Sequence, residues 1–515
     1  MTKSNNNSVD ITFIGAGIST AYTLISFIEK LSNLNNNSKI VKINVIDKYP
    51  EFFYGIPYGE RSGNTVLLIN SLRNFLPEKE RKIFINWLKK NKDILINEFL
   101  ALGGKQSNRW YENNQKDINQ GQWEELFIPR YFFGKYIVEK VKQSIADAIK
   151  EAFIEINFIT AEVIDLTKED GKFNLKLGNN TTLCSNKVVL SVGSMPTKKV
   201  FTEKLNFEDT NFLMINDIYN KTLDINFKKI ENFIKKRKSQ VTNVLIIGAN
   251  ASALESIYKI NNQEDLNNSV TKYYVLSTHG LMPDSEINHQ LNNTYIPKNL
   301  ENLKSSSSLT AKQIADAVYL DLDIAEDLNL GAASTVDIIS NAFGNLLNKL
   351  NEEELEIFAC KHGNEIGRRQ RCAGIHYTSV VDNLRNENKI IHKAGRFLNI
   401  SKENDSTYKV SYTDTKTKEL RFFTNIHLVI NCIGSINLES DKVPKVIKSL
   451  IENGICIPND SKIGFKVNKR FETKENFHVA GPLLAGNVIN ERPLWHLEHC
   501  ARIIWSSNLL GECLI

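Results

Sequence analysis

An apolar stretch that ends in two closely spaced glycines constrains the fold of this chain more than any other feature. Residues 10–14 are predicted to form a short buried strand, Gly15-Ala16-Gly17 follows at once, and Thr20–Lys30 has the pattern of a helix. Gly15 permits a tight turn, and Gly17 lets the backbone come close to a pyrophosphate at the helix N-terminus. The order of strand, glycines and helix predicts the start of a dinucleotide-binding βαβ unit.

An acidic residue at the end of the next apolar run supports this prediction. Ile43–Asp47 has the pattern of a second strand, and Asp47 could accept hydrogen bonds from a ribose. The polar insert Ser32–Ser38 explains the long distance to that acid, and Thr20 stands where a third glycine is usual. The alternative is a merely structural α/β turn, but the full series arises by chance far less often than a lone Gly-x-Gly.

A second, weaker unit of the same kind occurs in the middle of the chain. Asn243–Ile247 is followed by Gly248-Ala-Asn250, and Lys272–Leu276 is the next candidate strand. Asn250 occupies the close-approach position and would crowd a pyrophosphate. This segment predicts either a pyridine-nucleotide site or a structural Rossmann-like domain with a partly filled pocket.

Short candidate strands follow each of the two glycine turns. After the first turn the last of them is apolar and ends in glycine, which is typical of a meander that returns to the first sheet, and the same arrangement recurs late in the chain. The segments are 162–166, 173–177 and 187–193 after the first turn, and 408–412 and 427–434 after the second. The fold class is therefore predicted to be α/β with two Rossmann-like units.

Length, charge and cysteine content narrow the class of protein further. A chain of 515 residues is too long for one core, and its net charge of +5 is too small and too dispersed to indicate a nucleic-acid partner. No apolar run approaches the roughly 20 residues needed for a membrane span, and the polar N-terminus lacks a signal-peptide core. The seven cysteines have neither C-x-x-C nor zinc spacing, which predicts free thiols, no metal site and a cytoplasmic location.

Several segments outside the glycine turns are not generic for this fold. They are Tyr54-Gly-Ile-Pro-Tyr58 with Val66–Asn70, Ile128–Tyr136, Ser277–Pro283, Gly367–Arg371 and Phe477–Gly486. In this order they resemble the bacterial FAD/NAD(P)-binding protein family that includes urate-hydroxylase-like and amino-acid N-hydroxylase-like flavoproteins. The resemblance covers most of the chain, with the least support at 200–240 and 300–360.

The resemblance implies two Rossmann-like dinucleotide-binding domains of the flavin monooxygenase type, the second inserted into the first. It divides the chain into an FAD-binding domain of residues 1–200 and 390–515, a linker of 201–239, and an NAD(P)-binding-like domain of 240–389. Residues 310–356 have helical periodicity and are expected to form an insertion in the second domain that either covers a pocket or only packs.

The resemblance also implies cofactor-binding residues, with a turn-capping role for Asn70 and a surface ion pair for Arg130 as alternatives. The predicted FAD site consists of Gly15, Ala16, Gly17, Ile18, Ser19, Thr20, Asp47, Asn70, Arg130, Val163, Gly193, Gly481 and Pro482. The predicted nicotinamide site consists of Gly248, Asn250, Ala251, Ser252, Arg368 and Arg371.

The nicotinamide cofactor itself is open between NADPH and NADH. The family more often has an arginine pair after the second domain's strand, where this chain has Thr278 and His279. Arg368, Arg369 and Arg371 could supply charge for a 2′-phosphate, or they could simply be solvated.

The function implied is an FAD-dependent, NAD(P)H-using monooxygenase that hydroxylates a small metabolite or amino acid with molecular oxygen, through a flavin hydroperoxide. One alternative is a flavin oxidase or dehydrogenase without a working nicotinamide site, and another is a non-catalytic nucleotide-binding scaffold. The sequence identifies no catalytic side chain, no particular substrate, no preference for N- or C-hydroxylation and no oligomeric state.

Overall fold

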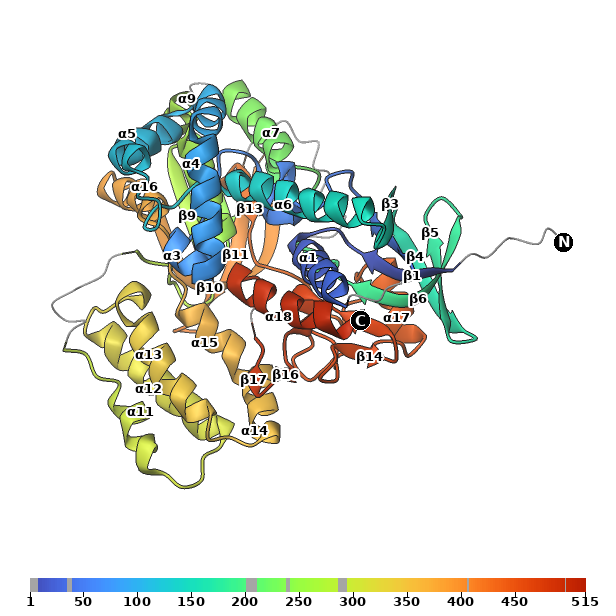
Figure 1. Cartoon of the computed structure of the whole chain (residues 1–515). Helices are drawn as coiled ribbons and strands as arrows, with labels where there is room; N and C mark the ends of the chain where they lie inside the picture. Colours follow the sequence, from blue (N-terminus) through green and yellow to red (C-terminus); the bar gives the residue numbers. More distant parts are fainter. Residues whose placement is uncertain are drawn as a thin grey trace.

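Two separate β-sheets organise the chain (Figure 1). The structure is a computed structural model that describes residues 8–34, 39–200, 211–237, 241–285, 294–404, 407–495 and 497–515. The strands of the second sheet all lie in sequence between β6 and β14 of the first sheet. The second unit is therefore inserted into the first.

The first sheet has eight strands in the order β14-β15-β6-β1-β2-β3, with the antiparallel pair β4-β5 attached through β6. Strands β15, β6, β1, β2 and β3 run parallel to one another, as expected for a sheet built from βαβ units. Their bounds are β1 Val9–Ile14, β2 Val41–Asp47, β3 Ile154–Thr160, β4 Val163–Glu169, β5 Lys172–Leu177, β6 Thr182–Leu190, β14 Glu472–Lys474 and β15 Phe477–Val479.

Helix α1 (Ile18–Asn33) packs between α6 (Arg130–Lys150) and α18 (Cys500–Cys513), so the first and the last helix of the chain lie side by side on the first unit (Figure 1). The residues of α1 that face the sheet are apolar and buried, among them Ala21, Leu24 and Phe27. This packing fixes the N-terminus of α1 at the end of β1.

The second sheet has seven strands in the order β12-β11-β10-β9-β8-β13-β7, and those from β10 to β7 are parallel. Helix α8 (Ala251–Asn261) joins β8 to the loop and short helix before β9. The strand bounds are β7 Leu213–Ile215, β8 Asn243–Ile247, β9 Lys272–Ser277, β10 Ile390–Lys402, β11 Tyr408–Asp414, β12 Leu420–Ile426 and β13 Leu428–Asn431.

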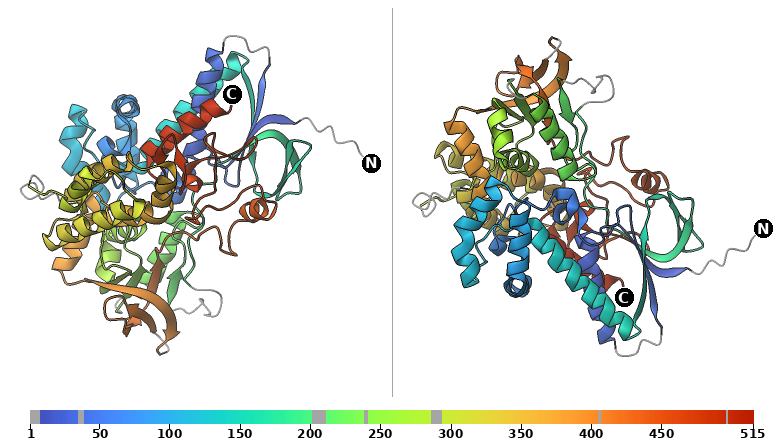
Figure 2. Two further views of the ribbon diagram at one scale, coloured as in Figure 1. Left: turned by 90° about the horizontal axis from the view of Figure 1, so that it is seen from below. Right: turned by 90° about the horizontal axis from the view of Figure 1, so that it is seen from above.

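The two units follow the same plan, and each contains one of the two predicted meanders. In the first, β4, β5 and the start of β6 form an antiparallel meander, and the end of β6 returns beside β1. In the second, β10, β11 and β12 form the meander, and β13 returns beside β8. The two meanders lie well apart in both views of Figure 2.

The predicted domain boundaries need two corrections. Residues 390–431 were assigned to the FAD domain, but β10–β13 pair in the second sheet. The segment 201–239 was assigned as a linker, but within its described part β7 is an edge strand of the second sheet and α7 (Leu223–Lys236) is an amphipathic helix. A strand's own sequence does not say which sheet it joins, whereas the apolar spacing of α7 is a local signal of a helix.

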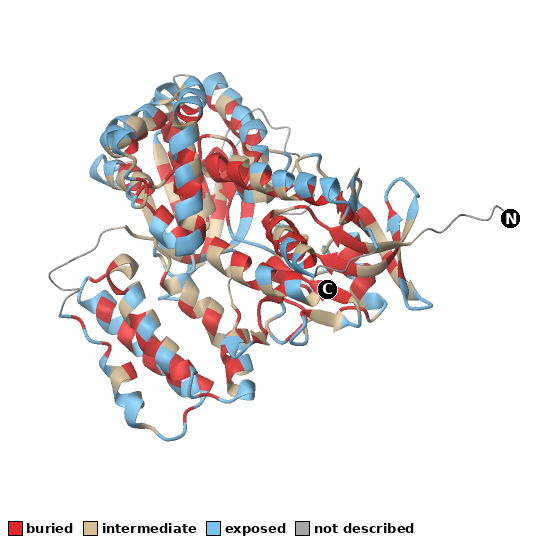
Figure 3. Cartoon of the chain, viewed as in Figure 1, coloured by how far each residue is buried: buried red, intermediate tan, exposed pale blue. Residues whose placement is uncertain are grey.

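The predicted helical insertion is present as a lobe at the lower left of Figure 1, with its own buried core. Figure 3 shows the buried residues on the facing sides of α12 and α13 and exposed residues on the outer sides. Its elements are α11 Lys298–Asn302, α12 Ala311–Asp327, α13 Ala332–Leu347, α14 Glu352–Ile357, a π-helical turn Phe358–His362 and α15 Gly363–Arg369.

The insertion also contacts the C-terminal part of the first unit. The ring of Trp495 packs against that of Phe358, with 5.5 Å between centroids, and the Cys360 thiol donates to the carbonyl oxygen of Gly486 at 3.1 Å. The insertion is therefore held against both units. Cys360 and the other six cysteines are free thiols, as predicted. In the described part of the chain, no helix is both long and apolar enough to cross a bilayer.

Candidate functional site

The first glycine turn is held by close backbone contacts that exclude any side chain at Gly15. Gly15 has a φ of +99°, and its N–H donates to the carbonyl oxygen of Ile46 at 2.8 Å. A Cβ atom at this position would overlap the carbonyl oxygen of Ser191, at the end of β6. Both the backbone conformation and the lack of space require glycine, as predicted.

The turn leaves N–H groups of α1 without a protein acceptor. Gly17 caps the helix without a side-chain hydrogen bond, and within the described residues no protein group accepts from the amides of Ile18 and Ser19. Beside them, the Asp47 carboxylate accepts from the amides of Ala16 at 2.8 Å and Tyr49 at 2.9 Å. These uncapped amides fit a pyrophosphate, and the oriented carboxylate fits a ribose.

Other predicted FAD residues lie around the same turn. Gly481 is so close to Ser19 that an added Cβ would lie 2.7 Å from the serine Oγ, and half-buried Pro482 follows in the same short 3₁₀ turn. Buried Val163 begins β4. Two residues before it, the amide of Ala161 donates to the carbonyl oxygen of Asp47, which places the start of β4 beside the end of β2. Gly193 follows Ser191 by two residues. The structure thus brings residues from five separate segments to one corner.

Thr20 has a role that the glycine pattern did not predict. Its fully buried hydroxyl donates to the carbonyl oxygen of Gly15 at 2.6 Å and lies 2.6 Å from the hydroxyl of Ser191. Because its hydrogen bonds stay inside the turn, the side chain fixes the turn and does not face a ligand. Asn70 is half-buried, and none of the described residues hydrogen-bonds to its side chain.

The second glycine turn is a close geometric copy of the first. Gly248 has a φ of +106°, donates to the carbonyl oxygen of Leu276 at 2.8 Å, and has no space for a Cβ beside the carbonyl of Cys432. Asn250 has φ −87° and ψ −164°, against −90° and −162° for Gly17. The Asn250 side chain is exposed and leaves the backbone of the turn as it is at Gly17, while the crowding of a pyrophosphate by this side chain stays a prediction.

Two positions of the copy carry different chemistry. Cys432 stands in place of Ser191, and burial raises the pKa of its thiol to about 12. Ser277 stands in place of Asp47. It follows Leu276, whose carbonyl accepts from the Gly248 amide, just as Asp47 follows Ile46, whose carbonyl accepts from the Gly15 amide. The Ser277 hydroxyl lies 2.7 Å from Nε2 of His392, whose pKa burial lowers to about 4, so the ring is neutral. The amides of Ala251 and Ser252 have no protein acceptor among the described residues.

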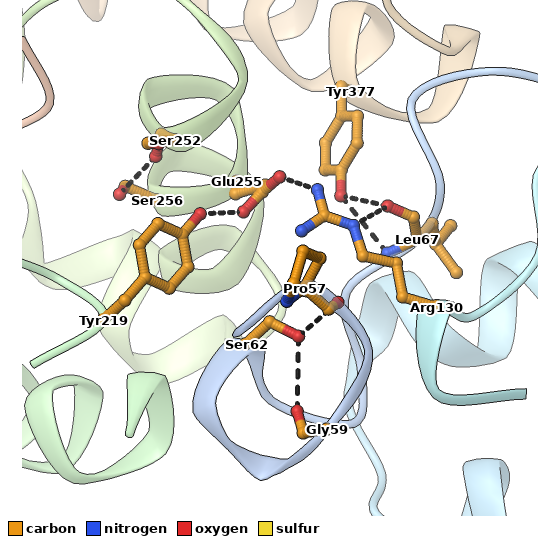
Figure 4. A network of polar contacts seen from close by, with 10 residues as sticks. All are labelled: Pro57, Gly59, Ser62, Leu67, Arg130, Tyr219, Ser252, Glu255, Ser256 and Tyr377. Atoms are coloured by element: carbon orange, nitrogen blue, oxygen red, sulfur yellow. Dashed lines mark hydrogen bonds and ion pairs between the residues drawn. The ribbon is translucent and has the colours of Figure 1, made fainter. Parts of the chain in front are cut away.

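Arg130 joins the two units (Figure 4). Its Nε donates to the carbonyl oxygen of Leu67 at 3.2 Å, and its guanidinium forms an ion pair with Glu255 of α8. The Tyr219 hydroxyl donates to the same carboxylate. The Arg130 and Glu255 side chains are only 11% and 2% exposed, so this is not the alternative surface pair, and a position of Arg130 near the flavin or pyrophosphate stays a prediction.

Sequence reasoning missed Glu255 and Tyr219. Glu255 was detectable as the one acidic residue of α8 with apolar residues around it, since an acid at such a position is buried only with a partner. Tyr219 lies in the segment that was assigned as a linker. A second tyrosine, Tyr377 of α16 (Ile375–Asn386), donates to the Leu67 carbonyl at 2.9 Å and strengthens the same contact between the units.

Among the described residues, no hydrogen bond or ion pair links the predicted arginines to the second glycine turn. Arg368 is exposed and pairs with Glu365 on its own helix at 3.2 Å. Arg371 lies in a packed region where burial lowers its pKa, an effect that nearby Glu498 opposes. Arg369, between them, bonds to Asp323 at 2.7 Å and to Glu326 at 2.8 Å.

Comparison with known families identifies the N-terminal unit. Residues 12–195 match the model of a family described as FAD-NAD(P)-binding. This segment is an FAD/NAD(P)-binding domain. It contains the first glycine turn, Asp47 and Gly193, so the predicted class of cofactor is confirmed for this domain. An uncharacterized protein of Mycobacterium tuberculosis is 29% identical over 525 residues, which cover 100% of this chain and 97% of that protein.

Solved structures similar to the whole chain confirm the predicted fold. The ornithine N-hydroxylase of Kutzneria sp. 744 matches with a TM-score of 0.54 and 10% identity over 98% of this chain and 99% of that one. The cadaverine monooxygenase of Erwinia amylovora matches with a TM-score of 0.54 and 10% identity, over 99% of this chain and 95% of that one. The ornithine hydroxylase of Pseudomonas aeruginosa matches with a TM-score of 0.52 and 12% identity, over 99% of this chain and 100% of that one. The chain thus has the two-domain fold of these flavin monooxygenases.

Proposed function

We propose that the chain is an FAD-dependent, NAD(P)H-using monooxygenase that hydroxylates an amine nitrogen of a small metabolite or amino acid. The observation that carries the proposal is the presence of two matched glycine turns, each with uncapped helix amides, in one chain. The family match of residues 12–195 supports FAD at the first turn. Structures of the same fold are named as an ornithine N-hydroxylase with reduced FAD, NADP⁺ and L-ornithine and as a cadaverine monooxygenase, which supports the reaction class.

The first site supplies binding and orientation. The amides of Ile18 and Ser19 would hold the pyrophosphate and Asp47 would accept from the ribose hydroxyls, with Gly481 close to Ser19 at the same turn. Bound FAD supplies the redox chemistry, which is electron transfer from a nicotinamide and activation of oxygen. The surrounding protein has to exclude water and align the substrate nitrogen.

The second turn favours this proposal over an oxidase without a nicotinamide site. The backbone at Asn250 matches that at Gly17, and the amides of Ala251 and Ser252 point out of an uncapped helix start. The buried Arg130–Glu255 pair holds this helix against the first unit. A nicotinamide nucleotide at the second turn would therefore be held in a fixed orientation toward the first site.

Anaerobic mixing of the FAD-loaded protein with NADH and NADPH tests the proposal. We expect at least one of them to bleach the visible flavin absorbance, and air with ornithine, lysine or cadaverine to give a hydroxylated product. The matched variant Gly248→Ala should keep FAD but lose bleaching, because the added Cβ overlaps the Cys432 carbonyl. A coloured protein that neither nucleotide bleaches would favour the oxidase or dehydrogenase, and a protein that takes up no FAD would favour the scaffold.

A further inference from the structure

A cavity of about 320 Å³ lies where β9 ends, between the second sheet and the helical insertion. His279, two residues after the end of β9, lines one side. Asp323 and Glu326 of α12 and Glu365 and Arg369 of α15 line the other. The cavity is therefore built jointly by the Rossmann-like unit and the insertion.

The internal copy identifies which part of a nucleotide this cavity would face. Asp47, at the end of β2, is the ribose-binding position of the first site, and Ser277 is its counterpart at the end of β9. The groups just beyond this position read the 2′ position of the adenosine ribose. Ser277 provides no carboxylate, and its hydroxyl is paired with His392. The residues beyond it therefore decide between a 2′-hydroxyl and a 2′-phosphate.

The lining carries more negative than positive charge. Arg369 is the one arginine that lines this cavity among the described residues, and both Asp323 and Glu326 bind it. Burial works against its charge, but the hydrogen bonds that Arg369 donates to these two acids raise its pKa above the ordinary value. Glu365 in turn lies 3.3 Å from Nε2 of His279 and 3.2 Å from Arg368. Among the lining residues, three carboxylates thus accompany one half-buried arginine and one histidine, and exposed Arg368 pairs with Glu365 from outside the lining.

We propose that this cavity makes the second site selective for NADH, with Glu365 as the specificity-determining residue. The Glu365 carboxylate contacts His279, which follows the end of β9. In the second site the carboxylate therefore comes from the insertion, whereas in the first site it comes from Asp47. A carboxylate accepts a hydrogen bond from a 2′-hydroxyl, whereas the 2′-phosphate of NADPH, with nearly two negative charges, is repelled by all three acids. This inference rests on the proposed function, because it assumes a nicotinamide nucleotide at the second turn.

Anaerobic reduction of the FAD-loaded protein, measured over a range of NADH and NADPH concentrations, tests the inference. We expect the ratio of reduction rate to dissociation constant to favour NADH by about tenfold or more. In Glu365→Gln this preference should fall at least about fivefold, mainly through the dissociation constants. Glu326→Gln, which frees Arg369 from one acid, should shift the preference in the same direction. Glu352→Gln, at an exposed position of α14 outside the cavity, is the matched control and should leave the ratio unchanged.

Equal or better use of NADPH by the unmodified protein would overturn the inference, as would an unchanged preference in both cavity variants. If neither nucleotide reduces the flavin, the proposed function fails instead. Calorimetric titration with NAD⁺ and NADP⁺ then tests the inference separately. The inference is supported if NAD⁺ binds more tightly than NADP⁺ and if Glu365→Gln reduces this difference. It is contradicted if NADP⁺ binds as tightly or more tightly, or if Glu365→Gln leaves the difference unchanged.

Discussion

Replacement of Gly15 by alanine is expected to abolish FAD binding and to lower the free energy of unfolding by about 3 kcal/mol. Gly15 has a φ of +99°, and its Cα faces the Ser191 carbonyl with no room for another carbon. Alanine must therefore push the end of β6 away from the turn. That shift also separates Ser191 from the Thr20 hydroxyl and turns the α1 amides out of position.

Flavin content after purification and thermal unfolding measure this effect. Gly171→Ala is the matched control, because Gly171 also has a positive φ (+77°) but no heavy atom lies within 4 Å of the added Cβ. It should cost about 1 kcal/mol and leave FAD binding intact. Normal flavin content in Gly15→Ala would show that the turn is not the pyrophosphate site.

Removal of one partner of the Arg130–Glu255 pair is expected to cost about 3–5 kcal/mol of stability. The two side chains are 11% and 2% exposed, so Glu255→Ala leaves a buried guanidinium without its carboxylate and Tyr219 without its acceptor. Because the pair joins α6 of the first unit to α8 of the second, the units should also unfold in separate steps. Differential scanning calorimetry measures both effects.

Two comparisons show whether the effect comes from unpaired charge. The triple variant Arg130→Met, Tyr219→Phe, Glu255→Leu replaces the network by apolar groups of similar size and should recover most of the lost stability. Asp382→Ala breaks an exposed Arg385 pair and should change stability by less than about 1 kcal/mol. A loss in Glu255→Ala no larger than that in Asp382→Ala would contradict the account.

The parts of the fold that the sequence predicted depend on local patterns. The strands around Gly15 and Gly248 and the helical insertion were visible because apolar periodicity and glycine position act over a few residues. Both meanders were visible for the same reason. Pairing between distant strands has no such local signal, so β10–β13 were assigned to the wrong sheet.

The site shows the same limit at the level of side chains. Asp47 lies at the end of its strand, where a motif can locate it, and it does flank the turn. Arg130 and Glu255 are 125 residues apart, and only the packing of the two units makes them partners. The third-glycine position was read as a contact with the ligand, yet the Thr20 hydroxyl is used inside the turn because β6 brings Ser191 beside it.

The most direct test of the central claim is an equilibrium titration of the purified, flavin-free protein with FAD, followed by the quenching of flavin fluorescence. The account predicts saturable, equimolar binding with a rise in melting temperature, both absent in Gly15→Ala. Two results together would contradict it: no quenching of flavin fluorescence beyond the effect of dilution, and an unchanged melting temperature.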